Sequence, residues 1–143
     1  MTQCVRYPYD ITIVEGGTYD MWFRWSTGPV GAVPEPVHIY GYSGIMQGRK
    51  KLTDELPLID LPNVTDPWVA DGISGIYIQD DDATADLFGV WRIYIKDENT
   101  LGLCERHKQV EGVYSLFLYN TLGEAVLNQY GTMTIEPSAA RTP

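Results

Sequence analysis

YDITIVEGGTYDMWFRW, residues 9–25, is the stretch that decides the fold class. Side chains alternate between the two faces of an extended chain, so residues 9, 11 and 13 share one face. The glycines at 16 and 17 can adopt the positive backbone angles of a tight turn. Alternation then resumes, with Tyr19, Met21, Phe23 and Trp25 on one face and Asp20, Trp22 and Arg24 on the other. Two alternating runs around a Gly-Gly turn predict a β-hairpin.

The rest of the chain repeats this pattern of short extended runs between turn signals. We expect strands over residues 38–49, 73–79, 90–96, 112–119 and 125–135, and a short one around 56–61. Residues 27–37 contain three prolines and two glycines, which disfavour both a helix and a central strand, so they predict a surface loop. Residues 97–111 are polar and loop-like. Residues 80–88 are typical of one short helical turn that ends at Gly89.

This order of elements predicts an all-β sandwich of about seven or eight antiparallel strands with one short helical turn. A fold of alternating strands and helices would need several longer helical segments. The 143 residues fit a single domain. We expect that domain to span residues 1–136 and to be followed by an exposed C-terminal tail over residues 137–143.

The charge balance argues against nucleic acid as a partner. The formal net charge is −9, and the only basic run is Arg49-Lys50-Lys51. Affinity for nucleic acid rests on Lys and Arg that displace counterions, and three charges are a poor footprint. The first six residues lack the apolar region of a signal peptide, and no apolar run approaches the length of a membrane span. We therefore expect the protein to be made and kept in the cytoplasm, or released by lysis.

The chemically reactive residues form no convincing catalytic or metal site. Two cysteines, Cys4 and Cys104, are too few for a disulfide scaffold. We expect both to be free thiols, and a disulfide between them is the alternative. Cys104 and His107 lie three residues apart but lack the surroundings of an activated nucleophile, and His38 is remote in sequence. The sequence therefore predicts no catalytic residues, no cofactor and no metal ligand.

The acidic run Asp80-Asp81-Asp82, with Asp86 nearby, leaves two interpretations open. Its carboxylates could cap the helical turn by accepting bonds from free backbone N–H groups. They could also bind a cation, but they do not match a calcium-binding loop. We favour the cap.

The aromatic residues are the strongest sign of a binding surface. The chain has 4 Trp and 10 Tyr, and alternation places Trp22 and Tyr94 opposite the more apolar faces of their strands. Exposed aromatic side chains mark protein interfaces or carbohydrate platforms. The alternative is that both sheet faces are covered within the domain. The candidate interface residues are Trp22, Pro29, Pro34, Pro36, Tyr94 and Arg141.

The joint order of these motifs resembles a family of tailed-bacteriophage virion proteins. The similarity runs from residues 9–19 through Phe23-Arg24-Trp25 and residues 40–49, and later through residues 83–87 and 112–116 to the closing stretch 131–137. These segments are similar to the immunoglobulin-like N-terminal domain of siphophage baseplate upper proteins and related minor tail proteins. Ile39-Tyr40 departs from the family pattern, and no helical or receptor-binding part follows Pro143 here, which favours a small adaptor or decoration subunit.

The resemblance implies an immunoglobulin-like sandwich and a virion structural protein without catalytic residues. Its partners would be other tail, baseplate, neck or capsid subunits, including further copies of itself, and it would assemble in the bacterial host cytoplasm. The contacts would come from the proline-rich loop, the C-terminal tail and Trp22. A capsid decoration protein, a carbohydrate-binding module using exposed Trp and Tyr, and a small hydrolase remain as alternatives.

Overall fold

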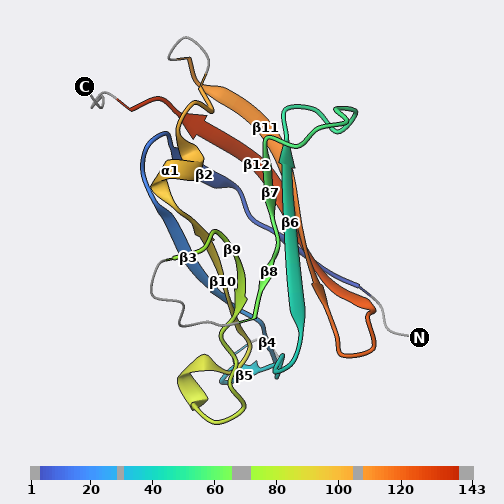
Figure 1. Cartoon of the computed structure of the whole chain (residues 1–143). Coiled ribbons are helices and arrows are strands. Elements are labelled where there is room, and N and C mark those ends of the chain that lie inside the picture. The colour runs from blue at the N-terminus through green and yellow to red at the C-terminus, as the bar shows by residue number, and fades with distance from the viewer. Residues whose placement is uncertain (1–3, 29–30, 66–71, 105–107, 139–143) are drawn as a thin grey trace.

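The computed structural model describes residues 4–28, 31–65, 72–104 and 108–138, and these residues form two facing β-sheets (Figure 1). The first sheet has the order β1-β12-β11-β6-β7, and β2 also pairs with β12. Its strands are β1 (Val5–Pro8), β2 (Ile11–Val14), β6 (Ser43–Arg49), β7 (Ile59–Leu61), β11 (Val110–Tyr119) and β12 (Ala125–Glu136).

The second sheet has the order β3-β10-β9-β8. Its strands are β3 (Tyr19–Arg24), β8 (Asn63–Val64), β9 (Gly75–Ile78) and β10 (Val90–Ile95). A two-stranded ribbon of β4 (Ser26–Thr27) and β5 (Glu35–Pro36) follows β3. The helical segments of the described residues are the 3₁₀ turn η1 (Ala85–Leu87) and the one-turn helix α1 (Asp97–Thr100).

This division of strands is that of an immunoglobulin-like sandwich, which confirms the predicted fold class. The β11–β12 hairpin and β6 lie together in one sheet, and β3, β10 and β9 lie together in the other, as strands F, G and C and strands B, E and D do in that fold. The predicted helical turn is confirmed as η1. Helix α1 lies in a segment that the sequence indicated as loop.

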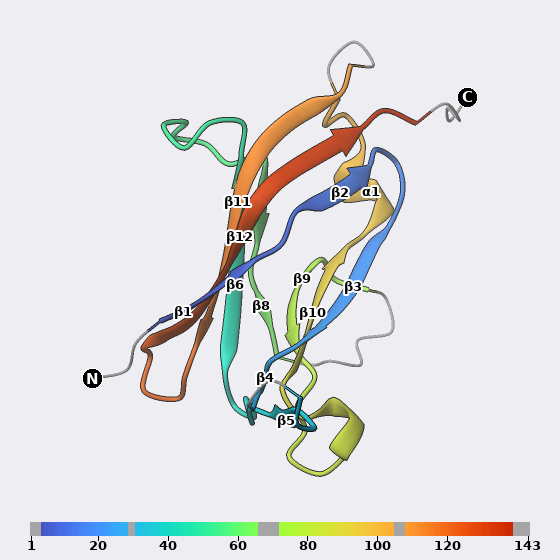
Figure 2. The ribbon, with the colours of Figure 1, turned by 180° about the vertical axis from the view of Figure 1, so that it is seen from behind.

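The strand count and the pairing differ from the expectation. The described residues form twelve strands, partly because β1 and β2 are separate pieces and because Pro62 separates β7 in the first sheet from β8 in the second. Not all pairs are antiparallel. Strands β1 and β2 both run parallel to β12, which Figure 2 shows, and β8 runs parallel to β9.

The predicted N-terminal hairpin is wrong, although both of its strands exist. Strand β2 pairs with β12 and β3 pairs with β10, so the turn at 15–18 crosses from one sheet to the other. Glu15 N–H still donates to the Glu136 carbonyl at 2.8 Å, so the chain stays on β12 up to the turn. The turn then closes with a 2.9 Å bond from Gly17 N–H to the Val14 carbonyl. Ile13 and Phe23 thereby enter the core from opposite sheets.

The core between the sheets is apolar, but a series of hydrogen-bonded polar side chains crosses it. Trp91 on β10 is fully buried and donates its indole N–H to the Oε1 of buried Gln129 on β12 at 2.9 Å. The Nε2 of Gln129 donates to the hydroxyl of Tyr114 on β11 at 3.1 Å, and that hydroxyl donates to the Tyr9 carbonyl. Burial raises the pKa of Tyr114, so its hydroxyl keeps the proton that it donates. This Gln129 network joins both sheets.

Replacing Gln129 with leucine removes the acceptor of the Trp91 indole and the donor to Tyr114. A buried polar group left without a partner costs about 1–3 kcal/mol, so we expect the free energy of unfolding to fall by about 2–4 kcal/mol. Urea unfolding monitored by circular dichroism measures this change. The control is Gln47→Leu on the outer side of β6, where we expect a change within about 0.5 kcal/mol. Equal losses in the two variants would contradict a structural role for the network.

Candidate protein-interaction face

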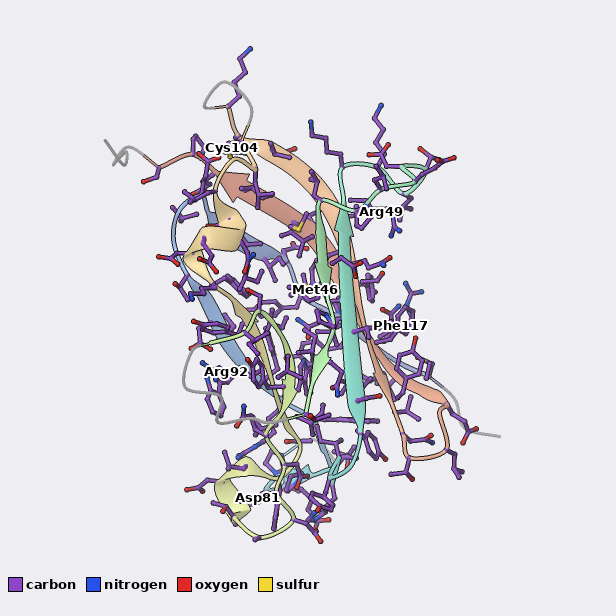
Figure 3. All side chains as sticks on the ribbon, in the orientation of Figure 1. Met46, Arg49, Asp81, Arg92, Cys104 and Phe117 are labelled. Atoms are coloured by element: carbon purple, nitrogen blue, oxygen red, sulfur yellow. The ribbon has the colours of Figure 1, made fainter. Side chains whose placement is uncertain are left out.

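The outer face of the second sheet gathers aromatic and charged side chains around Arg92. Strand alternation points Phe23 into the core and leaves its neighbour Trp22 with 45% of its surface exposed. On β10, Ile93 is buried while Arg92 and Tyr94 lie on the opposite side. Figure 3 shows Arg92 on this outer side of the sandwich.

Strand register brings the members of this face together. Trp22 on β3 and Tyr77 on β9 are the cross-strand partners of Arg92, and Asp20 is the partner of Tyr94. Because cross-strand partners on one face lie close enough to interact, pairing alone assembles the group. We call Asp20, Trp22, Tyr77, Arg92 and Tyr94 the Arg92 cluster.

The Arg92 guanidinium holds the cluster by two kinds of contact. Its central carbon lies 4.9 Å from the ring centroid of Tyr94 and 5.4 Å from those of Trp22 and Tyr77, within the range of cation–π attraction. Its Nε and one Nη donate to the two carboxylate oxygens of Asp20 at 2.7 and 2.8 Å. These bonds to the Asp20 carboxylate are the main reason that the pKa of Arg92 is raised, so the guanidinium remains charged.

The cluster therefore presents a side-chain surface that is ordered before any partner arrives. The Asp20–Arg92 pair is partly exposed, so solvent screening limits its contribution to stability to about 0–1 kcal/mol. Its larger effect is to fix the positions of Trp22 and Tyr94. Ordering side chains on binding costs free energy, and a preordered aromatic surface avoids much of that cost.

Strand β3 adds an open edge to this surface. Among the described residues it pairs only with β10, so the other side of the strand has main-chain groups available to a partner. Such an edge can accept an additional strand from another chain. The ribbon of β4 and β5 continues from the end of β3 and carries Pro36, which pairs with Ser26, while exposed Pro34 lies in the loop just before β5.

The structure brings together only part of the predicted interface. Trp22 and Tyr94 meet around Arg92, Pro36 lies on the neighbouring ribbon, and Pro34 lies in the loop just before β5. Pro29 and Arg141 fall outside the described residues. Sequence reasoning missed Arg92, Asp20 and Tyr77, although the charged positions that alternate with Trp91 and Ile93 were a visible signal.

The acidic run at residues 80–82 has a structural role in the loop before β10. Asp80 is 3% exposed, and its Oδ2 accepts bonds from the backbone N–H groups of Ile39 at 2.8 Å and Gly89 at 3.0 Å. Its Oδ1 accepts from the N–H of Asp82. Asp81 is exposed and accepts from the backbone and hydroxyl of Thr84, which together lower its pKa. No metal-binding group of three or more His, Cys, Asp or Glu is found among the described residues.

Cys4 and Cys104 are both free thiols. Cys104 is buried, and its Sγ lies 3.4 Å from the Ile135 carbonyl oxygen. Burial, followed by the nearby Glu15 carboxylate, raises the pKa of the Cys104 thiol, which disfavours the thiolate that a nucleophile requires. His107 lies outside the described residues.

Comparisons with known proteins leave the family of this chain open. No family model matches the sequence, and no curated protein matches it. No helix among the described residues combines the length and the hydropathy that crossing a membrane requires.

The Asp20–Arg92 pair is expected to stabilise the fold by a small, salt-dependent amount. A double-mutant cycle with Asp20→Asn and Arg92→Gln should give a coupling free energy of about 0.5–1 kcal/mol in low salt and less in 1 M salt. Urea unfolding provides the four stabilities. The control is the Lys96–Glu98 pair, whose longer contact, 3.7 Å between Nζ and Oε1, should couple more weakly. Coupling at Asp20–Arg92 that is no larger than at the control would contradict the proposed geometry.

Asp80 and Asp81 should respond differently to the same substitution. Asp80→Asn loses one of two oxygens that receive backbone N–H bonds and places an NH₂ group against those donors. We expect the free energy of unfolding to fall by about 2–4 kcal/mol. The predicted cap is wrong, because the N-cap of η1 is Thr84 and no side chain caps the turn. Asp81→Asn keeps a side-chain oxygen that can accept the same N–H bonds at an exposed position, so its effect should stay within about 0.5 kcal/mol. Urea unfolding of both variants measures the difference. Similar decreases in the free energy of unfolding would contradict a special stabilising role for the Asp80 hydrogen bonds.

Proposed function

We propose that the chain is a structural protein of a bacteriophage virion, a many-copy subunit of the tail, baseplate or neck that acts through protein–protein contacts and not by catalysis. The immunoglobulin-like sandwich is the fold that the phage resemblance implies. The observation that carries the proposal is Trp22, which is exposed on the open edge strand β3 and lies against the Arg92 guanidinium. Aromatic and arginine side chains in such a setting are typical anchors of protein interfaces.

The proposed partners are other virion subunits, including further copies of this chain, and assembly would take place in the bacterial host cytoplasm. A partner could add a strand to β3 and cover the indole of Trp22 at the same time. Main-chain bonds would then provide affinity, and the Arg92 cluster would provide specificity. A decoration protein on the capsid would use the same contacts, so particle location distinguishes the two variants of the proposal.

The test is whether the protein is present in purified phage particles. We expect antibodies against the recombinant chain to detect it in those particles by immunoblot, and immunogold electron microscopy to label the tail end. Label on the head would favour the decoration variant. Protein found in the lysate but absent from purified particles would contradict the proposal.

Incorporation should depend on Trp22. We expect Trp22→Ala, supplied in place of the wild-type chain, to reduce the amount of protein in particles by about tenfold or more, because truncating a central aromatic anchor costs about 2 kcal/mol. Tyr40→Ala is the matched control, because Tyr40 is 59% exposed but lies outside the Arg92 cluster. Equal incorporation of both variants would exclude Trp22 as an anchor.

The same exposed indole favours a carbohydrate-binding module as the second candidate. Sugar rings stack on exposed aromatic faces, and the polar groups of Asp20 and Arg92 lie beside Trp22. Titration of intrinsic tryptophan fluorescence with a glycan panel tests this alternative. A saturable response that Trp22→Ala abolishes would favour it, and no response across the panel would count against it.

A further inference from the structure

A groove of about 250 Å³ lies on the outer face of the first sheet, on the opposite side of the sandwich from the Arg92 cluster. Its walls include Ile45 and Arg49 from β6, Val113 and Phe117 from β11, and Leu52 from the loop after β6. Figure 3 shows Arg49 and Phe117 on this outer side, while Met46 points between the sheets. Ile45 is 42% exposed and Leu52 is 82% exposed, so the groove leaves apolar surface in contact with water.

Among the residues that the structure describes, Arg49 is the only charged one that lines this groove. Its Nε donates to the Asp54 carbonyl at 3.0 Å, and it forms no ion pair with any described residue. The remaining guanidinium N–H groups can therefore donate to a carboxylate. A guanidinium can bind the two oxygens of a carboxylate through two parallel hydrogen bonds. The groove thus fits an apolar side chain with a carboxylate close beside it.

The tip of the β11–β12 hairpin carries that combination. Leu122 is 82% exposed, and exposed Glu124 follows two residues later. The turn is well fixed, because the Asn120 side-chain oxygen accepts from the N–H groups of Leu122 and Glu124 at 3.0 and 2.9 Å, and Gly123 adopts a φ of 82°. Figures 1 and 2 show this hairpin projecting from the lower end of the first sheet.

We propose that the chain self-associates head to tail, with Leu122 of one copy seated in the groove of the next and its Glu124 carboxylate paired with Arg49. The two surfaces match in hydrophobicity and in charge. Exposed Leu122 beside the Glu124 carboxylate fits an apolar groove lined by Arg49, which forms no ion pair with the described residues. Burying an exposed leucine against apolar side chains drives the contact, and the ion pair sets its orientation.

Such a contact joins two different surfaces, so an open assembly of any length has one free groove at one end and one free tip at the other. Head-to-tail contacts of this type generate rings or open filaments. The inference goes beyond the proposed function, because it uses neither the Arg92 cluster nor the β3 edge. A Trp22→Ala chain should self-associate like the wild type, so failure of one proposal leaves the other intact.

Sedimentation velocity of the purified full chain over a concentration series tests the proposal. We expect the average mass of the wild type to rise with concentration, and Leu122→Asp and Arg49→Glu each to weaken association by at least about tenfold. Val33→Asp and Lys108→Glu are matched controls at exposed positions away from the groove and tip, and should associate like the wild type. A circular dichroism spectrum of each variant verifies its fold, and Leu122 lies on an exposed turn where substitution leaves the core intact.

Mixing and charge exchange make the test specific. An Arg49→Glu chain keeps its tip and a Leu122→Asp chain keeps its groove, so an equal mixture should form a dimer that grows no further. The double variant Arg49→Glu with Glu124→Arg should regain association that Glu124→Arg alone lacks. A wild type that stays monomeric, or tip variants that associate like the wild type, would overturn the proposal.

Discussion

The structure depends on the hydrogen-bonded chain that crosses its core from Trp91 through Gln129 to Tyr114 and the Tyr9 carbonyl. Apolar side chains favour burial in many arrangements, but a buried indole N–H and a buried amide require partners at definite places. One arrangement of the two sheets satisfies all of these groups. The network thus fixes β10 against β12 and β11, and it holds the chain between β1 and β2 beside them.

This arrangement places different kinds of side chain on the two outer faces of the sandwich. Because Trp91 and Ile93 point into the core, Arg92 and Tyr94 lie on the outer face. Strands β3 and β9 place Trp22, Asp20 and Tyr77 beside them. With Met46 and Leu116 committed to the core, the other sheet turns Ile45, Arg49 and Phe117 outward. The first face is ordered by its own ion pair. The second keeps an arginine that forms no ion pair with the described residues.

A buried carboxylate helps to hold the loops at one end of the sandwich, beside apolar contacts such as that of buried Ile39 with the core. Asp80 joins the segment before β6 at Ile39 to the start of β10 at Gly89. A carboxylate that accepts several N–H bonds can contribute strongly here, because each bond to a charged group contributes more than a neutral one. The acidic run therefore stabilises the loops, which accounts for one of the chain's most conspicuous motifs without a ligand.

The sequence by itself determined most of the longer strands and their faces, because the alternation of side chains is a local property that neighbouring residues dictate. It did not predict the short strands β1, β4, β5 and β8, and the strand expected over residues 38–49 begins only at Ser43. It correctly set Phe23 against Trp22, and the face of Trp91 against that of Tyr94. Only the tertiary structure decided which strands share a sheet: β2 leaves its neighbour β3 and runs along β12 instead. It also decided what surrounds Arg92, since Asp20 and Tyr77 come from other strands. Each strand can pair with any free strand edge of the molecule, so pairing depends on the whole fold. A short turn permits the chain to cross between sheets as readily as it permits a hairpin.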